Sequence, residues 1–106
     1  MAVSFSNLTL NKQEIHPGDP GYKFTEVPIY CTSGFHSLFG EDVITIINYA
    51  IKKLVHLESS VKSLDYLQTF EYTDSYGKNS AFWCISDIES SGGNGVGITF
   101  LLPEEY

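Results

Sequence analysis

The stretch from residue 31 to residue 37 holds the best set of side chains for nucleophilic chemistry. It contains Cys31, Ser33, His36 and Ser37. A serine or cysteine nucleophile needs a base beside it and a third group that orients the base. The G-x-S-x-G sequence of a nucleophile elbow is absent, and Ser37 also suits the first turn of a helix, where its oxygen would accept from backbone amides. We therefore predict no catalytic residue and no enzyme. A small hydrolase or ligand-binding enzyme centred on residues 31–37 is the alternative.

Metal and cofactor chemistry has little support in the spacing of the ligand-type residues. His16, His36 and His56 stand far from one another, and Cys31 and Cys84 form no close pair. A zinc site needs three or four ligands in a recognisable rhythm, and the glycines between residues 92 and 97 match neither common phosphate-loop pattern. We therefore expect no metal and no cofactor, and two free thiols in a reducing cytosol.

The charge of the chain is strongly one-sided. Thirteen Asp and Glu stand against six Lys, with no Arg, which gives a net charge of −7. Arginine is the planar, bidentate donor on which most phosphate sites depend, so its absence counts against direct nucleic-acid binding. The negative field favours a basic protein as the partner.

Length and composition indicate one globular domain, residues 1–106. Hydrophobic residues make up 42% of the chain and aromatic residues 14%, which is typical of a packed core rather than of an acidic disordered tail. No apolar run is long enough to cross a membrane, and the first ten residues lack the basic and apolar regions of a secretory signal. We therefore predict a cytoplasmic protein that does not bind membranes.

The pattern of apolar residues predicts five strands and one helix. Short strands are expected at 3–10 and 22–32, separated by a turn at 16–21 that has two prolines and two glycines. Pro28 cannot donate to a neighbouring strand, which favours a sheet edge or a bulge. The most secure helix starts at Val43, with an apolar stripe at three- and four-residue steps that comprises Val43, Ile47, Ala50, Ile51, Leu54 and Val55.

The C-terminal half indicates a three-stranded meander. Alternating residues run over 64–73, 82–89 and 97–102, with a turn at 75–79 and a glycine-rich hairpin loop at 90–95. The predicted fold is α+β in the order β-β-α-β-β-β: an antiparallel sheet of about four to five strands with one helix packed on one face. The other face must then meet solvent or a partner.

Acidic residues recur along the predicted strands and suggest how that face could bind. Asp65, Glu71, Asp87 and Glu89 are expected to project from one exposed face, and Trp83 belongs to the same alternating set as Asp87 and Glu89. Tryptophan is enriched at binding hot spots, and charges speed encounter and set specificity. We predict these five residues as partner contacts. An ordinary solvated acidic surface is the alternative.

Three blocks of the sequence resemble a known family. Residues 64–71 (LDYLQTFE) are similar to the LDYLQxFE signature of domain of unknown function 960, and residues 101–106 (LLPEEY) to its closing LL-x-EEY. A looser match, Y-x-T-x-G, rests on Tyr30, Thr32 and Gly34. The first 29 residues have no counterpart. The resemblance implies no catalytic residue, only a context: short proteins of Gram-positive bacteria, their phages and plasmids.

Together these observations favour a small protein–protein interaction module. The specific hypothesis is a phage- or plasmid-encoded inhibitor of a nucleic-acid-binding host defence enzyme such as a CRISPR nuclease, that is, an anti-CRISPR-type protein. Its carboxylates would imitate the phosphates that a basic groove normally binds. A self-associating structural protein is a further alternative.

Overall fold

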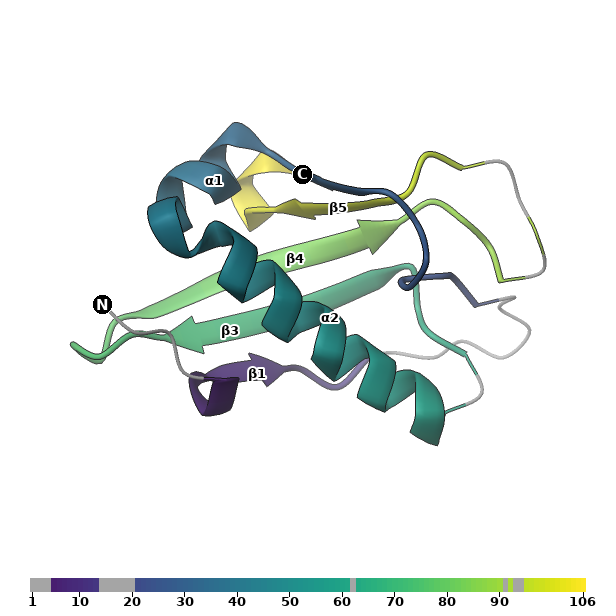
Figure 1. Cartoon of the computed structure of the whole chain (residues 1–106), viewed down its shortest axis with the longest axis horizontal. Coiled ribbons are helices and arrows are strands. Elements are labelled where there is room, and N and C mark those ends of the chain that lie inside the picture. The colour runs from purple at the N-terminus through teal and green to yellow at the C-terminus, as the bar shows by residue number, and fades with distance from the viewer. Residues whose placement is uncertain (1–4, 14–20, 62, 91, 93–94) are drawn as a thin grey trace.

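A five-stranded sheet forms the centre of the molecule (Figure 1). The computed structural model describes residues 5–13, 21–61, 63–90, 92 and 95–106. The strands lie in the order β1-β3-β4-β5-β2, with bounds β1 Leu8–Leu10, β2 Ile29–Cys31, β3 Leu67–Thr73, β4 Asn79–Ser86 and β5 Ile98–Leu101. All neighbours pair antiparallel except β2, which runs parallel to β5. The predicted α+β class is confirmed, as is the meander of β3, β4 and β5.

Strand β2 is much shorter than the predicted strand at 22–32. Glu26 has a positive φ of 59°, which an extended strand cannot contain, and Tyr22 makes only an isolated bridge to Glu89. Pro28 lies directly before β2, and its carbonyl accepts from the Ile98 amide at 2.9 Å. Because β2 is the outermost strand next to β5, the edge position that Pro28 indicated is confirmed.

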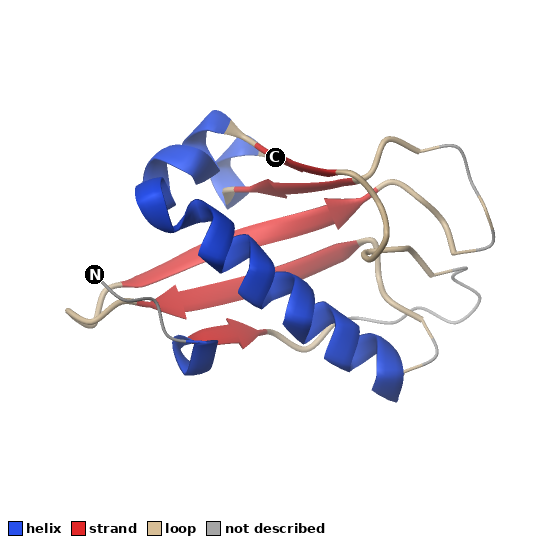
Figure 2. Cartoon of the chain, in the orientation of Figure 1, coloured by secondary structure: helices blue, strands red, loops and turns tan. Residues whose placement is uncertain are grey.

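Both α-helices lie on one face of the sheet (Figure 2). Helix α1 (Ser33–Phe39) is followed by a 3₁₀ turn, η2 (Gly40–Asp42), and by the long helix α2 (Val43–Ser60), so the predicted single helix is preceded by a short extra one. Two further 3₁₀ turns are η1 (Phe5–Asn7) and η3 (Pro103–Glu105). None of the helices in the described part of the chain is long and apolar enough to cross a membrane.

Helix α2 buries a slightly different stripe from the one that the sequence predicted. Its buried residues are Val43, Ile46, Ile47, Ala50 and Leu54. Val55 is 50% exposed, because it is rotated by about 100° from Leu54 around the helix. The prediction for Val55 is wrong, and Ile46 takes its place in the core.

Phenylalanines fix the helices to the centre of the sheet. Phe82 on β4 stacks on Phe70 of β3, with ring centroids 4.9 Å apart, and meets Phe35 of α1 edge-on at 5.2 Å. All three side chains are fully buried, as is Phe100 of β5. The face that carries these rings is therefore the covered face, and the alternate residues of each strand form the open face.

Some sequence predictions lie outside the described residues. They are His16, most of the predicted turn at 16–21, the start of the strand at 3–10 and part of the loop at 90–95.

Candidate functional site: the open face of the sheet

Two neighbouring rows of residues on the open face of the sheet are mainly apolar. Register places Thr69, Trp83 and Leu101 in one row across β3, β4 and β5. The next row joins Leu67, Ile85, Thr99 and Tyr30 across four strands. Both α-helices pack on the opposite side of the sheet (Figure 2). Aliphatic and aromatic side chains from four strands are thereby gathered on the side of the sheet that α1 and α2 do not cover.

Four aromatic residues from separate segments meet at this face, and we call them the aromatic cluster: Tyr22, Tyr66, Trp83 and Tyr106. Tyr106 packs edge-on against Trp83, with ring centroids 5.5 Å apart, and Tyr66 packs against Tyr22 at 6.0 Å. A hydrogen bond with the Tyr106 hydroxyl, reinforced by the charge of that group, raises the pKa of Tyr66. Tyr66 is 39% and Tyr106 72% exposed. Such rings combine a large contact area with a polar tip, as binding surfaces require.

The C-terminal segment is held in place by Glu105. Its carboxylate accepts hydrogen bonds from the Thr32 hydroxyl, from the Gly34 amide at 3.3 Å and from the Leu102 amide at 2.9 Å. These bonds hold the pKa of Glu105 below its usual value, and the hydrogen bond from Thr32 has the largest effect. Thr32 also caps α1, because its hydroxyl oxygen accepts from the Phe35 amide. The Glu105 contacts therefore anchor the residue that precedes Tyr106.

These contacts join the three sequence blocks quoted above. Thr32 and Gly34 of the first block bind Glu105 of the last, and Tyr66 of the middle block binds Tyr106 of the last. The sequence alone indicated no role for Tyr22, Tyr66, Glu105 or Tyr106. One sequence feature could have indicated them: in two of the three blocks a tyrosine directly follows an acidic residue, as in Asp65-Tyr66 and Glu105-Tyr106.

Two of the five predicted contact residues lie together on the open face. Glu71 on β3 pairs with Ala81 on β4, and Trp83 pairs with Thr69. Glu71 and Trp83 are therefore diagonal neighbours, within reach of one partner side chain.

The other three predicted contact residues are not on strands. Asp65 precedes β3, and Asp87 and Glu89 follow β4, at the right-hand end of the sheet in Figure 1. The Asp65 carboxylate accepts from the Tyr66 amide at 2.9 Å. That of Asp87 accepts from the amides of Gly97 at 2.9 Å and Val96 at 2.8 Å, which lowers its pKa. Of the four carboxylates expected on one face, only Glu71 projects from a strand.

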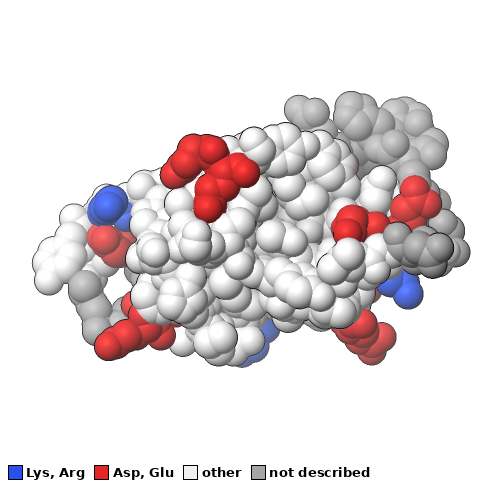
Figure 3. Space-filling model, turned by 90° about the horizontal axis from the view of Figure 1, so that it is seen from above, with Lys and Arg blue, Asp and Glu red and all other residues white. Residues whose placement is uncertain are grey.

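The acidic side chains are not gathered in one place on the side of the molecule that carries β2. Seen from the β2 edge, the acidic side chains form several separate groups with uncharged surface between them (Figure 3). On this side of the molecule the carboxylates therefore form no continuous track.

Residues 31–37 are arranged differently from an enzyme's nucleophile loop. Ser33, His36 and Ser37 are exposed residues of α1, and no hydrogen bond joins the three side chains in this fully described segment. Cys31 is exposed, whereas Cys84 is buried, and both are free thiols. Among the described residues no group of three His, Cys, Asp or Glu could hold a metal ion.

The fold and the open face define a small α+β domain with both α-helices on one side of its sheet and aromatic residues of the strands and the C-terminal segment on the other. No family model, curated protein or solved structure matches the chain. The resemblance to domain of unknown function 960 therefore stays a prediction.

Proposed function

We propose that this protein is a protein–protein interaction module that binds a basic partner through the open face of its sheet. The aromatic cluster carries the proposal, because Trp83 lies on the central strand, between Thr69 of β3 and Leu101 of β5. Rings of this kind, surrounded by contacts that exclude water, supply most of the energy at protein interfaces.

Charge decides which partner suits the face. With a net charge of −7 and no arginine, the molecule attracts basic surfaces and repels nucleic acid. Glu71 stands on the face itself, and Asp65 and Asp87 stand at its end. A basic groove that normally holds nucleic acid has the complementary charge.

The specific form of the proposal is an inhibitor of a nucleic-acid-binding host defence enzyme, such as a CRISPR nuclease. Net charge, the missing arginine and the resemblance to phage and plasmid proteins support it. The protein would act inside the cell by occupying the enzyme's basic groove, with contacts from Asp65, Glu71, Trp83, Asp87 and Glu89.

The test begins with affinity capture on the immobilised chain at low salt, followed by titration of the purified captured protein. The expected partner is a basic nucleic-acid-binding enzyme whose binding weakens steeply with salt and competes with its nucleic acid. Trp83→Ala should weaken binding at least about tenfold, and Glu71→Gln should chiefly slow association. Tyr76→Ala is the matched control, because Tyr76 is 84% exposed in the turn between β3 and β4.

Two results would contradict the proposal. Binding that is insensitive to salt would indicate an apolar interface instead, and unchanged affinity of Trp83→Ala would remove the open face from the interface. The apolar open face also favours self-association as a second candidate. Sedimentation velocity separates the two, because self-association raises the mass with concentration and Trp83→Ala would prevent it.

A further inference from the structure

The edge of the sheet beyond β2 is open. β2 is the last strand in the order β1-β3-β4-β5-β2, and none of the described residues pairs with its outer side. All three of its residues, Ile29, Tyr30 and Cys31, are exposed. The strand at the opposite edge differs, because Leu8 of β1 is buried. β2 is therefore an edge strand of uncharged, largely apolar residues that are in contact with solvent.

Two hydrogen bonds show how the backbone of β2 is oriented. The carbonyl of Pro28, directly before β2, accepts from the Ile98 amide at 2.9 Å. The amide of Thr32, directly after β2, donates to the Phe100 carbonyl at 3.0 Å. Both bonds go to β5, and their spacing is that of a regular parallel ladder.

The residues between these two bonds alternate in the direction of their backbone groups. Tyr30 is two residues from each bond and therefore also faces β5, in agreement with its register. The amides and carbonyls of Ile29 and Cys31 consequently point away from β5 and form the outer edge of the sheet. A row of backbone groups of this kind is a template for one more strand.

The part of the chain around this edge contains no lysine or arginine. Residues 24–51 and 79–106 include β2, α1, β4 and β5. Their charged residues are all acidic: Glu26, Glu41, Asp42, Asp87, Glu89, Glu104 and Glu105. Glu26 lies three residues before β2, and the Glu105 carboxylate binds Thr32 directly after it, so both ends of the strand have a carboxylate nearby. Lysine commonly protects an edge strand from pairing, and β2 has none.

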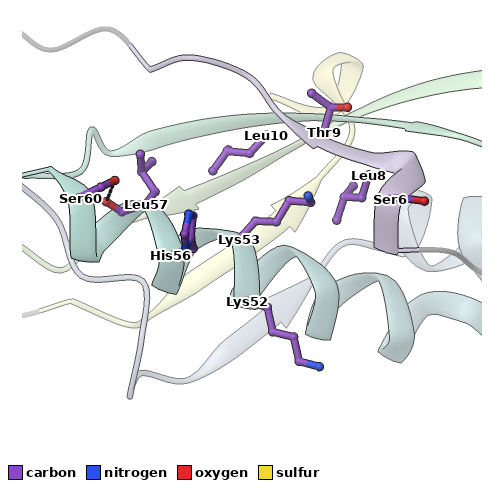
Figure 4. A pocket seen from close by; sticks show the side chains of 9 residues that line it. All are labelled: Ser6, Leu8, Thr9, Leu10, Lys52, Lys53, His56, Leu57 and Ser60. Atoms are coloured by element: carbon purple, nitrogen blue, oxygen red, sulfur yellow. Dashed lines mark hydrogen bonds between the residues drawn. The ribbon is translucent and has the colours of Figure 1, made fainter.

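The charge around the opposite edge of the sheet has the other sign. Lys52, Lys53 and His56 line a groove between β1 and α2 (Figure 4). A second copy of this chain at β2 would bring together two regions that have only carboxylates, which repel one another. Charge therefore favours a different occupant, a strand that has lysines or arginines of its own.

We propose that β2 binds an extended segment of another protein as a sixth strand of the sheet, with β-branched residues at the centre of the segment and Lys or Arg at its ends. The backbone of the segment would pair with the outward groups of Ile29 and Cys31. Its central side chains would pack beside Ile29 and Tyr30, and its basic ends would lie near Glu26 and Glu105. The site does not rest on the proposed function, because no residue of the aromatic cluster takes part.

The probe is the peptide acetyl-Lys-Val-Thr-Val-Thr-Val-Lys-amide, titrated into the full ¹⁵N-labelled chain under reducing conditions and followed by NMR. We expect saturable shifts at the amides of residues 29–31. Hydrogen exchange of the Ile29 and Cys31 amides should slow at least about tenfold at saturation, because these amides gain acceptors. Exchange of the Tyr30 amide should slow less, because it already donates to β5.

Two matched peptides separate backbone pairing from charge. The same sequence with N-methyl groups on its five central residues cannot pair with a strand edge, so it should give no saturable shift. The same sequence with Glu in place of both Lys keeps the backbone and reverses the charge. It should bind at least about tenfold more weakly.

Matched variants connect the binding to the edge. Ile29→Lys places a cation on β2, so peptide affinity should fall about tenfold. Ile44→Lys makes the same change at an exposed residue of α2 and should bind as the wild type does. Trp83→Ala should also bind as the wild type does, which separates this site from the open face. The amide spectrum of each variant reports directly whether it is folded.

Four results would overturn the proposal: no saturable shifts at β2, equal binding of the N-methylated peptide, equal binding of the acidic peptide, and an Ile29→Lys variant that binds the peptide as the wild type does. Dimerisation through β2 in the absence of peptide would also overturn it, because a second copy would then be the occupant of the edge. Sedimentation velocity of wild type and Ile29→Lys measures this directly.

Discussion

Replacing Gly97 with alanine tests how β2 is held against β5. Gly97 directly precedes β5 and has a φ of +148°, and a Cβ atom there would lie 2.3 Å from the Pro28 carbonyl oxygen. That oxygen accepts the hydrogen bond from the Ile98 amide at 2.9 Å. Ordinary van der Waals contact between the added Cβ and the Pro28 oxygen begins at 3.4 Å. Pro28 must therefore move away by about 1 Å, which lengthens the hydrogen bond from the Ile98 amide until it is broken.

The cost has two parts. A non-glycine residue in such a backbone conformation costs about 1–3 kcal/mol, and the lost hydrogen bond costs about 0.5–1.5 kcal/mol. We therefore expect Gly97→Ala to lower the free energy of unfolding by about 1.5–4.5 kcal/mol. With a urea m value of about 1.5 kcal/mol/M, the unfolding midpoint should fall by about 1–3 M.

The assay is urea unfolding followed by far-UV circular dichroism and by the fluorescence of Trp83. Gly77→Ala is the matched control, because Gly77 has a φ of +84° but nothing lies within 4 Å of its added Cβ. It should lose only about 1–2 kcal/mol, from the backbone conformation alone. If Gly97→Ala is no less stable than Gly77→Ala, the close approach of β2 to β5 is not the cause and the reasoning fails.

Three further predictions concern the anchored C-terminus, the two thiols and the core. The pKa of Glu105 in the folded chain lies below its ordinary value of 4.5. The Glu105 carboxylate therefore stabilises the fold above pH 4.5, and this stabilisation is lost as the pH falls through the lower pKa of the folded chain. Unfolding midpoints measured across this range should therefore show less acid sensitivity for Glu105→Gln than for the wild type, and equal sensitivity would contradict the role of Glu105. A thiol reagent should modify one cysteine per native chain, because Cys31 is exposed whereas burial raises the pKa of the Cys84 thiol. Cys31→Ser should abolish that reaction. Fast modification of both thiols would contradict the burial of Cys84. Phe82→Ala should cost about 3–5 kcal/mol in urea unfolding, and a loss below about 1 kcal/mol would mean that its stacked rings are not the centre of the core.

The helix and the meander could be predicted because both signals are local. Apolar residues at three- and four-residue steps indicated α2, and alternating residues indicated β3 and β4. Pro28 indicated an edge because it lacks an amide hydrogen, and β2 is an edge strand. These features depend on the period of each element and on single residues, so they can be recognised without knowledge of the partner strands.

The positions of the predicted contact residues could be foreseen only in part. Alternation placed Glu71 and Trp83 on one face correctly. Asp65 and Asp87 continue the same alternation, but their carboxylates accept backbone amides in the connections, and a side chain that satisfies the backbone in this way competes with strand pairing. Periodicity alone does not reveal where that competition ends a strand.

By itself the amino-acid sequence determined the α+β class, the amphipathic helix, the meander and the strong negative charge, because each follows from composition or from short-range spacing. Only the tertiary structure decided which residues meet. It brought Glu105 to Thr32, and Tyr106 to Tyr66 and Trp83. Contacts between segments far apart in the chain depend on strand order and register, and register is set by the packing of the whole sheet rather than by any one strand.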